Sequence, residues 1–324
     1  MCTAITYTTK DHYFGRNLDL EYSYDETVTV VPRNFPLVFR HKESINKHYA
    51  IIGMAYVVNG YPLYYDAINE MGVGMAGLNF PDNCHYNQCA EDKDNIAPFE
   101  FIPYILANCK NICEVKDRLK NINIINENFS NNLPLTPLHW IITDKNETIV
   151  VEQIKDGLKI YDNPVGVLTN NPSFDMQLFA LNNYINLTVK QPECHFSDKA
   201  ELFRYSRGMG AIGLPGDVSS QSRFVRAAFN KLNSKSGEEE VKSVEQFFHI
   251  LGSVEQIRGC NEIDDSKYEI TVYSSCANLD KGVYYYTTYN NRRITAIDMH
   301  KVDLDGSGLT QYSLVTDGQI LCGN

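Results

Sequence analysis

The feature that most constrains this chain is its N-terminal stretch, which has a cysteine at the second position. Residues 3–7 (TAITY) are typical of a β-strand, and residues 9–11 (TKD) are typical of a polar turn. A hairpin of that length returns the next block, residues 14–19 (FGRNLD), to the start of the chain. We therefore expect Arg16 and Asp19 to lie beside Cys2.

Cys2 becomes both nucleophile and base if Met1 is removed, because its α-amine is then free beside its thiol. An α-amine titrates near ~8 and a thiol near ~8.5, so at neutral pH some of the amine accepts the thiol proton. Arg16 would favour the thiolate, and Asp19 would hold the α-ammonium group. The alternative is that Cys2 is a small apolar residue that opens a strand.

Five blocks of the sequence carry a family resemblance. They are residues 1–3 (MCT), 15–19 (GRNLD), 77–81 (GLNFP), 168–172 (LTNNP), and 214–217 with 222–224 (LPGD and SRF). Together they resemble the choloylglycine hydrolases, which are the bile salt hydrolases and penicillin V acylases of the N-terminal-nucleophile superfamily. The resemblance extends in the same order from residue 1 to about residue 300.

The resemblance implies an α+β fold, the four-layer αββα sandwich, formed by residues 1–324 as one domain after removal of Met1. It implies that Asn79 and Asn170 serve the oxyanion and the leaving amine. The full set of implied catalytic residues is Cys2, Arg16, Asp19, Asn79, Asn170 and Arg223. The implied chemistry needs no metal and no organic cofactor, and the family commonly forms tetramers, so we expect a homotetramer.

The substrate implied by the resemblance is a conjugated bile salt, cleaved to the free bile acid and glycine or taurine. Bile salt hydrolases tend to carry asparagine where penicillin V acylases carry tyrosine, and this chain has Asn79. The alternatives are a penicillin V acylase, another N-acyl amide hydrolase, and a non-catalytic protein that binds amphipathic anions. An apolar pocket for the acyl group is expected to involve Leu18, Leu20, Phe129, Leu133 and Leu138, each of which is also compatible with plain core packing.

The composition of the chain argues against some classes of function. A chain of 324 residues with 43% hydrophobic and 21% charged residues is typical of a globular protein with a sizeable core. The net charge of −11 argues against binding to nucleic acid or to anionic membrane surfaces. We find no secretory signal and no apolar run long enough to span a bilayer. The odd number of cysteines, nine, favours a reducing cytoplasm over a disulfide framework.

Strands are expected at both ends of the chain and helices between them, which suggests layered sheets covered by helices. The strands expected from sequence are 27–31, 49–52, 72–78, 138–142, 148–152 and 282–288. A helical stretch is expected over 98–121, with a break or kink at Pro103. Further helices are expected at 222–232 and from Ser243 onward. Residues 82–97 and 122–137 are expected to be loops.

Several short motifs resemble sites for other functions but lack the sequence context that those sites need. Two G-x-G-x-x-G stretches, at 72–77 and 208–213, run into Pro81 and Pro215 rather than into a helix, which argues against a dinucleotide site. The cysteine spacings at 84–89 and 109–113 do not match zinc knuckles, and residues 303–306 form a turn rather than a calcium loop. His139 is the best candidate for a papain-like base, but we interpret it as a hydrogen-bonded core residue.

Overall fold

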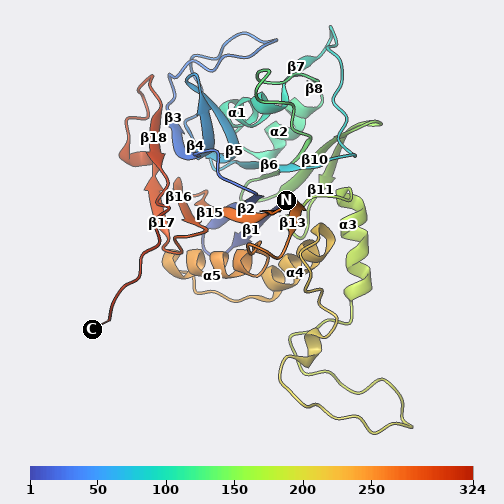
Figure 1. The fold of residues 1–324 in the computed structure, drawn as a ribbon. Coiled ribbons are helices and arrows are strands. Elements are labelled where there is room, and N and C mark those ends of the chain that lie inside the picture. Colours follow the sequence, from blue (N-terminus) through green and yellow to red (C-terminus); the bar gives the residue numbers. More distant parts are fainter. Residues whose placement is uncertain (324) are drawn as a thin grey trace.

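Two antiparallel sheets lie face to face, with helices on both outer faces, as Figure 1 shows. The structure is a computed structural model that describes residues 1–323. The helices α4 (Ser220–Asn233) and α5 (Glu240–Gly252) cover one sheet, and α1 (Pro98–Asn108) packs on strands of the other. The expected α+β class and the αββα sandwich are therefore confirmed.

The six-stranded sheet contains both strands of the expected N-terminal hairpin. Its order is β12-β1-β2-β15-β16-β17. The bounds are β12 Val167–Leu168, β1 Cys2–Thr8, β2 His12–Leu20, β15 Ile270–Asn278, β16 Val283–Thr288 and β17 Thr295–Asp298. In the hairpin Cys2 pairs with Leu18 and Ala4 pairs with Arg16, so the return of the second strand to the N-terminus is confirmed.

The eight-stranded sheet has the order β11-β10-β9-β6-β5-β4-β3-β18. Its strands are β11 Gly157–Asp162, β10 Thr148–Ile154, β9 Leu138–Thr143, β6 Gly74–Asn79, β5 Tyr61–Asn69, β4 Ile51–Val58, β3 Thr27–Val31 and β18 Thr310–Ser313. The expected pairing of the strands at 138–142 and 148–152 is present as β9 and β10. The strand expected at 72–78 is β6, and no helix follows its glycines directly.

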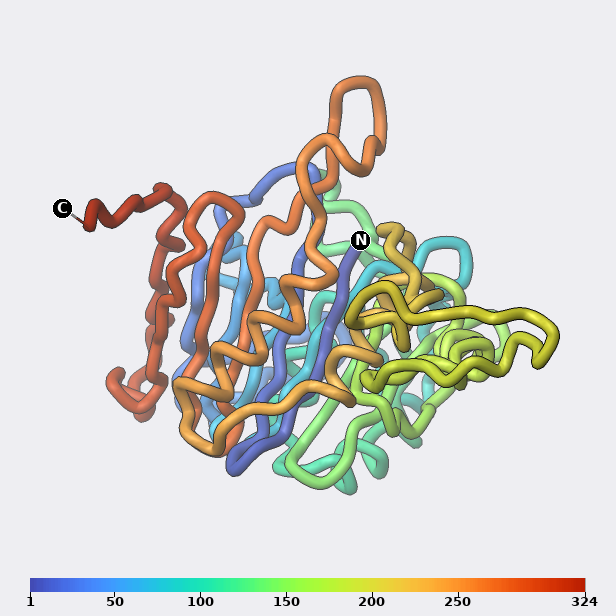
Figure 2. The backbone as a smooth tube through the Cα atoms, turned by 90° about the horizontal axis from the view of Figure 1, so that it is seen from below, coloured from blue at the N-terminus to red at the C-terminus, as the bar shows by residue number. Residues whose placement is uncertain are grey.

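Two small pairs of strands lie outside the main sheets. In the first, β7 (Asp94–Ile96) runs parallel to β8 (Ile122–Ile124), within segments that the sequence suggested were loops. In the second, β13 (Glu262–Asp264) and β14 (Lys267–Tyr268) form a hairpin that projects beside the N-terminus, as Figures 1 and 2 both show.

The helices differ from the sequence expectation in two places. The bounds are α1 Pro98–Asn108, α2 Ile112–Leu119, α3 Phe174–Ala180, α4 Ser220–Asn233 and α5 Glu240–Gly252, with short 3-10 turns η1 Leu181–Tyr184, η2 Met209–Ala211 and η3 Met299–Lys301. The stretch 98–121 is two helices, and the break is not at Pro103 but before Asn111, whose side chain accepts from the Glu114 N–H and begins α2. Ser243 lies inside α5 rather than at its start.

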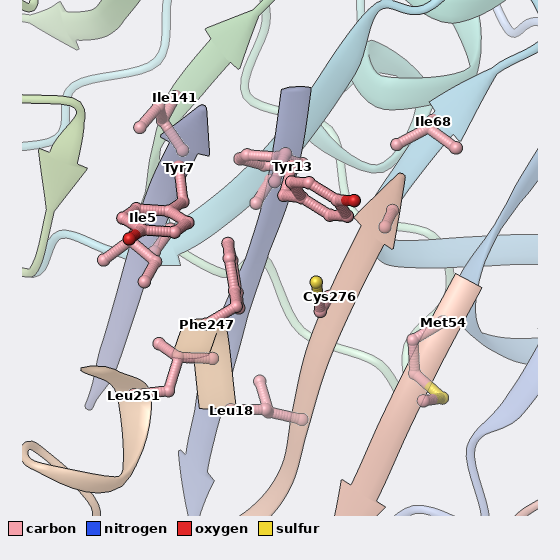
Figure 3. Packing of buried hydrophobic residues seen from close by; sticks show 14 of the residues in the cluster. Ile5, Tyr7, Tyr13, Leu18, Met54, Ile68, Ile141, Phe247, Leu251 and Cys276 are labelled. Carbon is pink, nitrogen blue, oxygen red and sulfur yellow. The ribbon is translucent and has the colours of Figure 1, made fainter. Parts of the chain in front are cut away.

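The largest core cluster fills the space between the two sheets and beneath α4 and α5. Figure 3 shows part of it, with Phe247 and Leu251 of α5 beside side chains of the six-stranded sheet. A second cluster lies between the eight-stranded sheet and α1, where Phe101 meets Trp140 edge to face at 4.8 Å. Both sheets are thus buried on two faces, which agrees with their largely apolar strands.

A long arm, residues 185–213, extends away from the rest of the protein between η1 and α4, as Figures 1 and 2 show. Hydrogen bonds join its two sides, for example from the Thr188 N–H to the Gly210 carbonyl at 3.0 Å. Its large apolar side chains are exposed, Phe196 by 80% and Phe203 by 81%. None of the helices within residues 1–323 is long and apolar enough to cross a lipid bilayer.

Candidate active site

The Cys2 thiol is buried at the start of β1, with 4% of the residue exposed. Met1 precedes it in the structure, so the Cys2 nitrogen is a peptide N–H, and it donates to Asn170 Oδ1 at 2.9 Å. The Met1 amine pairs with Glu269 and donates to the Asp19 carbonyl at 2.8 Å. The Asn170 side chain therefore already lies where a Cys2 amine would need a hydrogen-bond acceptor.

Arg223 reaches the site from the first turn of α4 and is fully buried. Its Nη1 donates to the Cys2 carbonyl and to Thr3 Oγ1, and its Nη2 donates to Asn170 Oδ1 at 2.8 Å. The Asp19 carboxylate is the expected acidic partner, with Oδ2 at 4.0 Å from Nη1. Burial lowers the pKa of Arg223, and the neighbouring Asp19 and Cys2 oppose that shift.

Asp19 is fully buried near the end of β2. Its Oδ1 accepts from Thr271 Oγ1 at 2.6 Å, whereas Oδ2 has no hydrogen-bond partner among residues 1–323. Burial raises the pKa of Asp19, and Arg223 and the nearby N-terminal amine counteract the rise. Asp19 Oδ2 is therefore available to accept a hydrogen bond from a cationic group placed beside it.

Arg16 spans the space between the two sheets. From β2 its Nη1 donates to the carbonyls of Tyr65 and Gly77, which belong to the facing sheet. Its Nη2 is buried without a hydrogen-bond partner in the described part of the chain. Burial alone would lower the pKa of Arg16, but nearby groups, with Cys2 foremost among them, raise it overall. The guanidinium group is thus held by backbone carbonyls and keeps one donor free.

A buried carboxylate that the sequence analysis missed supports Arg16. Asp66 of β5 accepts from Tyr273 and Tyr284 at 2.6 Å each and from Ser275 at 3.0 Å. Ser275 in turn accepts from the Arg16 N–H at 3.1 Å. The one available signal was an isolated aspartate in the aromatic strand 61–69 (YPLYYDAIN).

Asn170 connects the nucleophile to Asn79. Its Nδ2 donates to the Asn79 carbonyl at 2.7 Å, while its Oδ1 accepts from Cys2 and Arg223. Asn79 ends β6, and its side chain is exposed and makes no hydrogen bond with any described residue. The structure therefore brings together all six residues that the resemblance implied, and leaves the Asn79 amide free to donate.

A cavity of about 170 Å³ opens on the eight-stranded sheet beside Arg16. Tyr65 and Gly77 line it, and these are the residues whose carbonyls bind Arg16. Three of the leucine and phenylalanine residues expected at an acyl pocket line it as well, namely Phe129, Leu133 and Leu138. Phe129 also belongs to an aromatic cluster, since it meets Phe99 edge to face at 5.2 Å.

Leu18 and Leu20, the other two residues expected at an acyl pocket, do not line this cavity. The strand pairing sets Leu18 opposite Cys2, where surrounding side chains close over it and leave it 3% exposed. Leu20 packs against the edge of the same core cluster. Both residues contribute to the core around the nucleophile and not to the cavity wall.

His139 is not placed to act as a base for Cys2. It is fully buried, and its Nδ1 lies 3.0 Å from Glu152 Oε1 while its Nε2 lies 2.9 Å from the Thr169 carbonyl. Both ring nitrogens are therefore occupied, which agrees with its interpretation as a hydrogen-bonded core residue. Within residues 1–323 we find no cluster of three histidine, cysteine or acidic side chains suited to a metal ion.

Arg226 lies three residues after Arg223 in α4 and is half-buried. Its guanidinium group donates to the carbonyls of Ser253, Pro215 and Asp217. It ties α4 to the loop before the helix and to the end of α5. None of these three carbonyl groups hydrogen-bonds to Cys2, Asn170 or Arg223.

Comparison with known proteins gives a consistent result over the whole chain. The family described as linear amide C–N hydrolases, choloylglycine hydrolase family, matches residues 2–312. A bile salt hydrolase/transferase of Lactiplantibacillus plantarum is 56% identical over 324 residues, which is all of both chains. A second bile salt hydrolase/transferase, from Clostridium perfringens, is 42% identical and covers 96% of each chain.

Solved structures agree with these relatives. A variant of the conjugated bile acid hydrolase from Clostridium perfringens superposes with a TM-score of 0.92 at 41% identity, over all of both chains. The penicillin V acylase from Agrobacterium tumefaciens has a TM-score of 0.74 at 21% identity, over 96% of this chain and 90% of that one. The similarity to the penicillin V acylase shows a shared fold.

Proposed function

The chain belongs to the choloylglycine hydrolase family of linear amide C–N hydrolases, and we propose that its substrates are bile salts conjugated to glycine or taurine. The observation that carries the proposal is the 56% identity over full length to a bile salt hydrolase/transferase. The products are the free bile acid and the amino acid or taurine. No step needs a metal or an organic cofactor.

We propose that Cys2 is the nucleophile and that removal of Met1 supplies its base. The family match begins at residue 2, which supports this assignment. Asn170 Oδ1 lies 2.9 Å from the Cys2 nitrogen and would accept from the freed amine. Arg16, with one buried donor unpaired, favours the thiolate, and Asp19 Oδ2 offers a carboxylate oxygen to the cationic groups of the site.

The proposed reaction proceeds through a thioester. The thiol proton passes to the Cys2 amine, and the sulfur attacks the amide carbon. Asn79 and Asn170 donate to the oxyanion and orient the leaving nitrogen. The ammonium group protonates that nitrogen as the C–N bond breaks. Water then loses a proton to the same amine, attacks the thioester and releases the acid and the thiol.

The acyl group is proposed to bind in the cavity lined by Phe129, Leu133 and Leu138. Its volume of about 170 Å³ is below the ~300–1,000 Å³ of most ligand sites, so part of a steroid would extend beyond its mouth. With the protein's net charge of −11, the anionic conjugate must be held by apolar contact and local cations. Tyr65 and Gly77 place this cavity next to Arg16.

Release of free amine from glycocholate, taurocholate and penicillin V distinguishes the candidate functions. We expect rapid release of glycine or taurine and little hydrolysis of penicillin V. Faster hydrolysis of penicillin V would identify the protein as an acylase with the same chemistry. Binding of glycocholate without amine release would support a non-catalytic protein that binds amphipathic anions.

The mass of the active protein tests the processing step. We expect a mass short by one methionine residue. A form with an uncleavable N-terminal extension should melt normally and be inactive, because a peptide bond removes the basicity of the Cys2 amine. A C-terminal tag should have no effect. Full activity with residues retained before Cys2 would rule out this base.

We propose further that residues 1–324 act as one catalytic domain, that the protein is a homotetramer, and that it works in the cytoplasm. The shared core between the two sheets supports the first proposal. The exposed apolar arm, residues 185–213, supports assembly, since such surface is costly to leave in water. All nine cysteines are free within residues 1–323, which supports a reducing compartment.

A further inference from the structure

His139 and Glu152 form a buried pair that contacts the sequence neighbours of the two asparagines of the site. Both residues have no exposed surface, and His139 Nδ1 lies 3.0 Å from Glu152 Oε1. His139 Nε2 lies 2.9 Å from the Thr169 carbonyl, the residue that precedes Asn170. The imidazole also stacks on the ring of Phe80, the residue that follows Asn79, with centroids 4.3 Å apart and planes 7° apart.

We propose that His139 is a positioning residue that holds Asn79 and Asn170 in register with each other and with Cys2. The inference rests on the proposed hydrolase function. One ring contacts the neighbours of both asparagines, through a hydrogen bond on one side and through stacking on the other. The strand pairing adds to this, since His139 is paired with Leu78 and Leu138 with Asn79.

Hydrogen bonds on both sides hold the ring of His139 in place. The Thr169 carbonyl only accepts, so His139 Nε2 carries a proton. Glu152 Oε1 accepts from the Phe174 N–H at 3.0 Å and lies within hydrogen-bond distance of His139 Nδ1, so it fixes the other side of the ring. With a partner at each ring nitrogen and Phe80 against its face, the imidazole is fixed in position between the two segments that carry the asparagines.

The Asn170 turn needs this support because its other contacts do not orient the Thr169 carbonyl. Thr169 Oγ1 donates to Gln177, and the Asn170 N–H donates to Ser220 Oγ at 2.8 Å. Without the His139 donor, the Thr169 carbonyl would be buried and unpaired, and the peptide before Asn170 would be expected to rotate. Displacement of a catalytic group by 1 Å costs on the order of 100-fold in rate.

The test compares two variants with the wild type on glycocholate. His139→Phe combined with Glu152→Gln keeps a ring against Phe80 and an acceptor for the Phe174 N–H, but removes the donor to Thr169. Glu152→Gln alone is the matched control, because it makes the same change at residue 152 and leaves His139 Nε2 in place to donate to the Thr169 carbonyl. Both variants avoid leaving an unpaired buried charge, so both should fold.

We expect kcat of the double variant to fall by roughly 30- to 100-fold, with KM within about threefold of the wild type, because the acyl cavity is built from other residues. Glu152→Gln alone should keep kcat within about fivefold. Equal kcat in the two variants would overturn the proposal, and so would a KM that rises as much as kcat falls. If the proposed function itself is wrong, the wild-type protein will release no glycine from glycocholate, and this result is distinct from any difference between the two variants.

Discussion

Three charged side chains around Cys2 have no solvent exposure: Arg16, Asp19 and Arg223. An ion taken out of water is destabilised by several kcal/mol unless partners replace its hydration. Backbone carbonyls do this for Arg16, and the Cys2 carbonyl and the Asn170 amide do it for Arg223. Burial raises the pKa of Asp19, and the charge of Arg223 counteracts this rise. The charged forms of these two residues therefore stabilise each other.

Cys2→Ser tests the nucleophile. The hydroxyl is much less acidic than the thiol, so the α-amine is too weak a base to activate it. We expect turnover of glycocholate to fall by at least about 100-fold, as for loss of other nucleophiles, with an unchanged melting temperature. Cys113→Ser, at an exposed cysteine of α2, is the matched control and should keep full activity. Wild-type rates in Cys2→Ser would place the nucleophile elsewhere.

Asn79→Tyr tests the oxyanion donor and the basis of the substrate preference. Asn170 binds the backbone carbonyl of Asn79, so that contact survives the substitution, whereas the exposed side-chain amide is lost. Loss of one oxyanion donor costs about 100-fold or more in kcat. Initial rates on glycocholate and penicillin V measure the change, and unchanged kinetics on glycocholate would make Asn79 a scaffold residue.

At the scale of elements, α4 places a cation where a helix disfavours one. Arg223 lies in the first turn, near the positive end of the helix dipole. Its acceptors lie on other elements, the Cys2 carbonyl on β1 and the Asn170 side chain after β12. The unfavourable position is thus compensated by the site itself, and α4 is tied to the strand that carries the nucleophile.

The arm, residues 185–213, exposes several large apolar side chains to solvent. Phe196, Phe203 and Tyr205 are exposed by 80%, 81% and 74%, so burial against other chains would be favourable. Changing all three to serine should lower the molar mass measured by light scattering from four times 36.9 kDa to a smaller assembly. Serine at Met71 and Val241, which are exposed elsewhere, is the control. An unchanged tetramer would assign the interface to another surface.

At the scale of the whole molecule, the sequence predicted the parts whose signals are local. The N-terminal hairpin follows from strand patterning and a short turn, and the blocks around Asn79 and Asn170 are continuous motifs. The supports of the site were not predictable in this way. Asp66 meets Tyr273 and Tyr284 across more than two hundred residues, and His139 meets Thr169 across thirty. Such partners are identified only when both sheets are in place.

His12 connects the two sheets and makes the stability of the whole fold depend on pH. From β2 its Nδ1 lies 2.8 Å from Thr8 Oγ1, and its Nε2 lies 3.0 Å from Thr143 Oγ1 on the facing sheet. Burial, together with the nearby Lys231, lowers the pKa of His12 from its usual 6.5 to about 4, although Asp280 and Asp144 counteract the shift. Between these two values the unfolded chain binds more protons at this residue than the folded protein does.

Acidification should therefore destabilise the fold through His12. The contribution of this residue is fully present above pH 6.5 and is lost as the pH falls from there toward 4. The difference between a pKa of 6.5 in the unfolded chain and about 4 in the folded protein corresponds to about 3 kcal/mol in the free energy of unfolding. Urea unfolding at pH 7 and pH 4 should show the wild type losing about that much more stability than His12→Gln. His195→Gln, at an exposed histidine, should follow the wild type. If the His12→Gln protein instead loses as much stability as the wild type, the acid sensitivity arises from other groups, and the neutral ring between the sheets does not contribute to it.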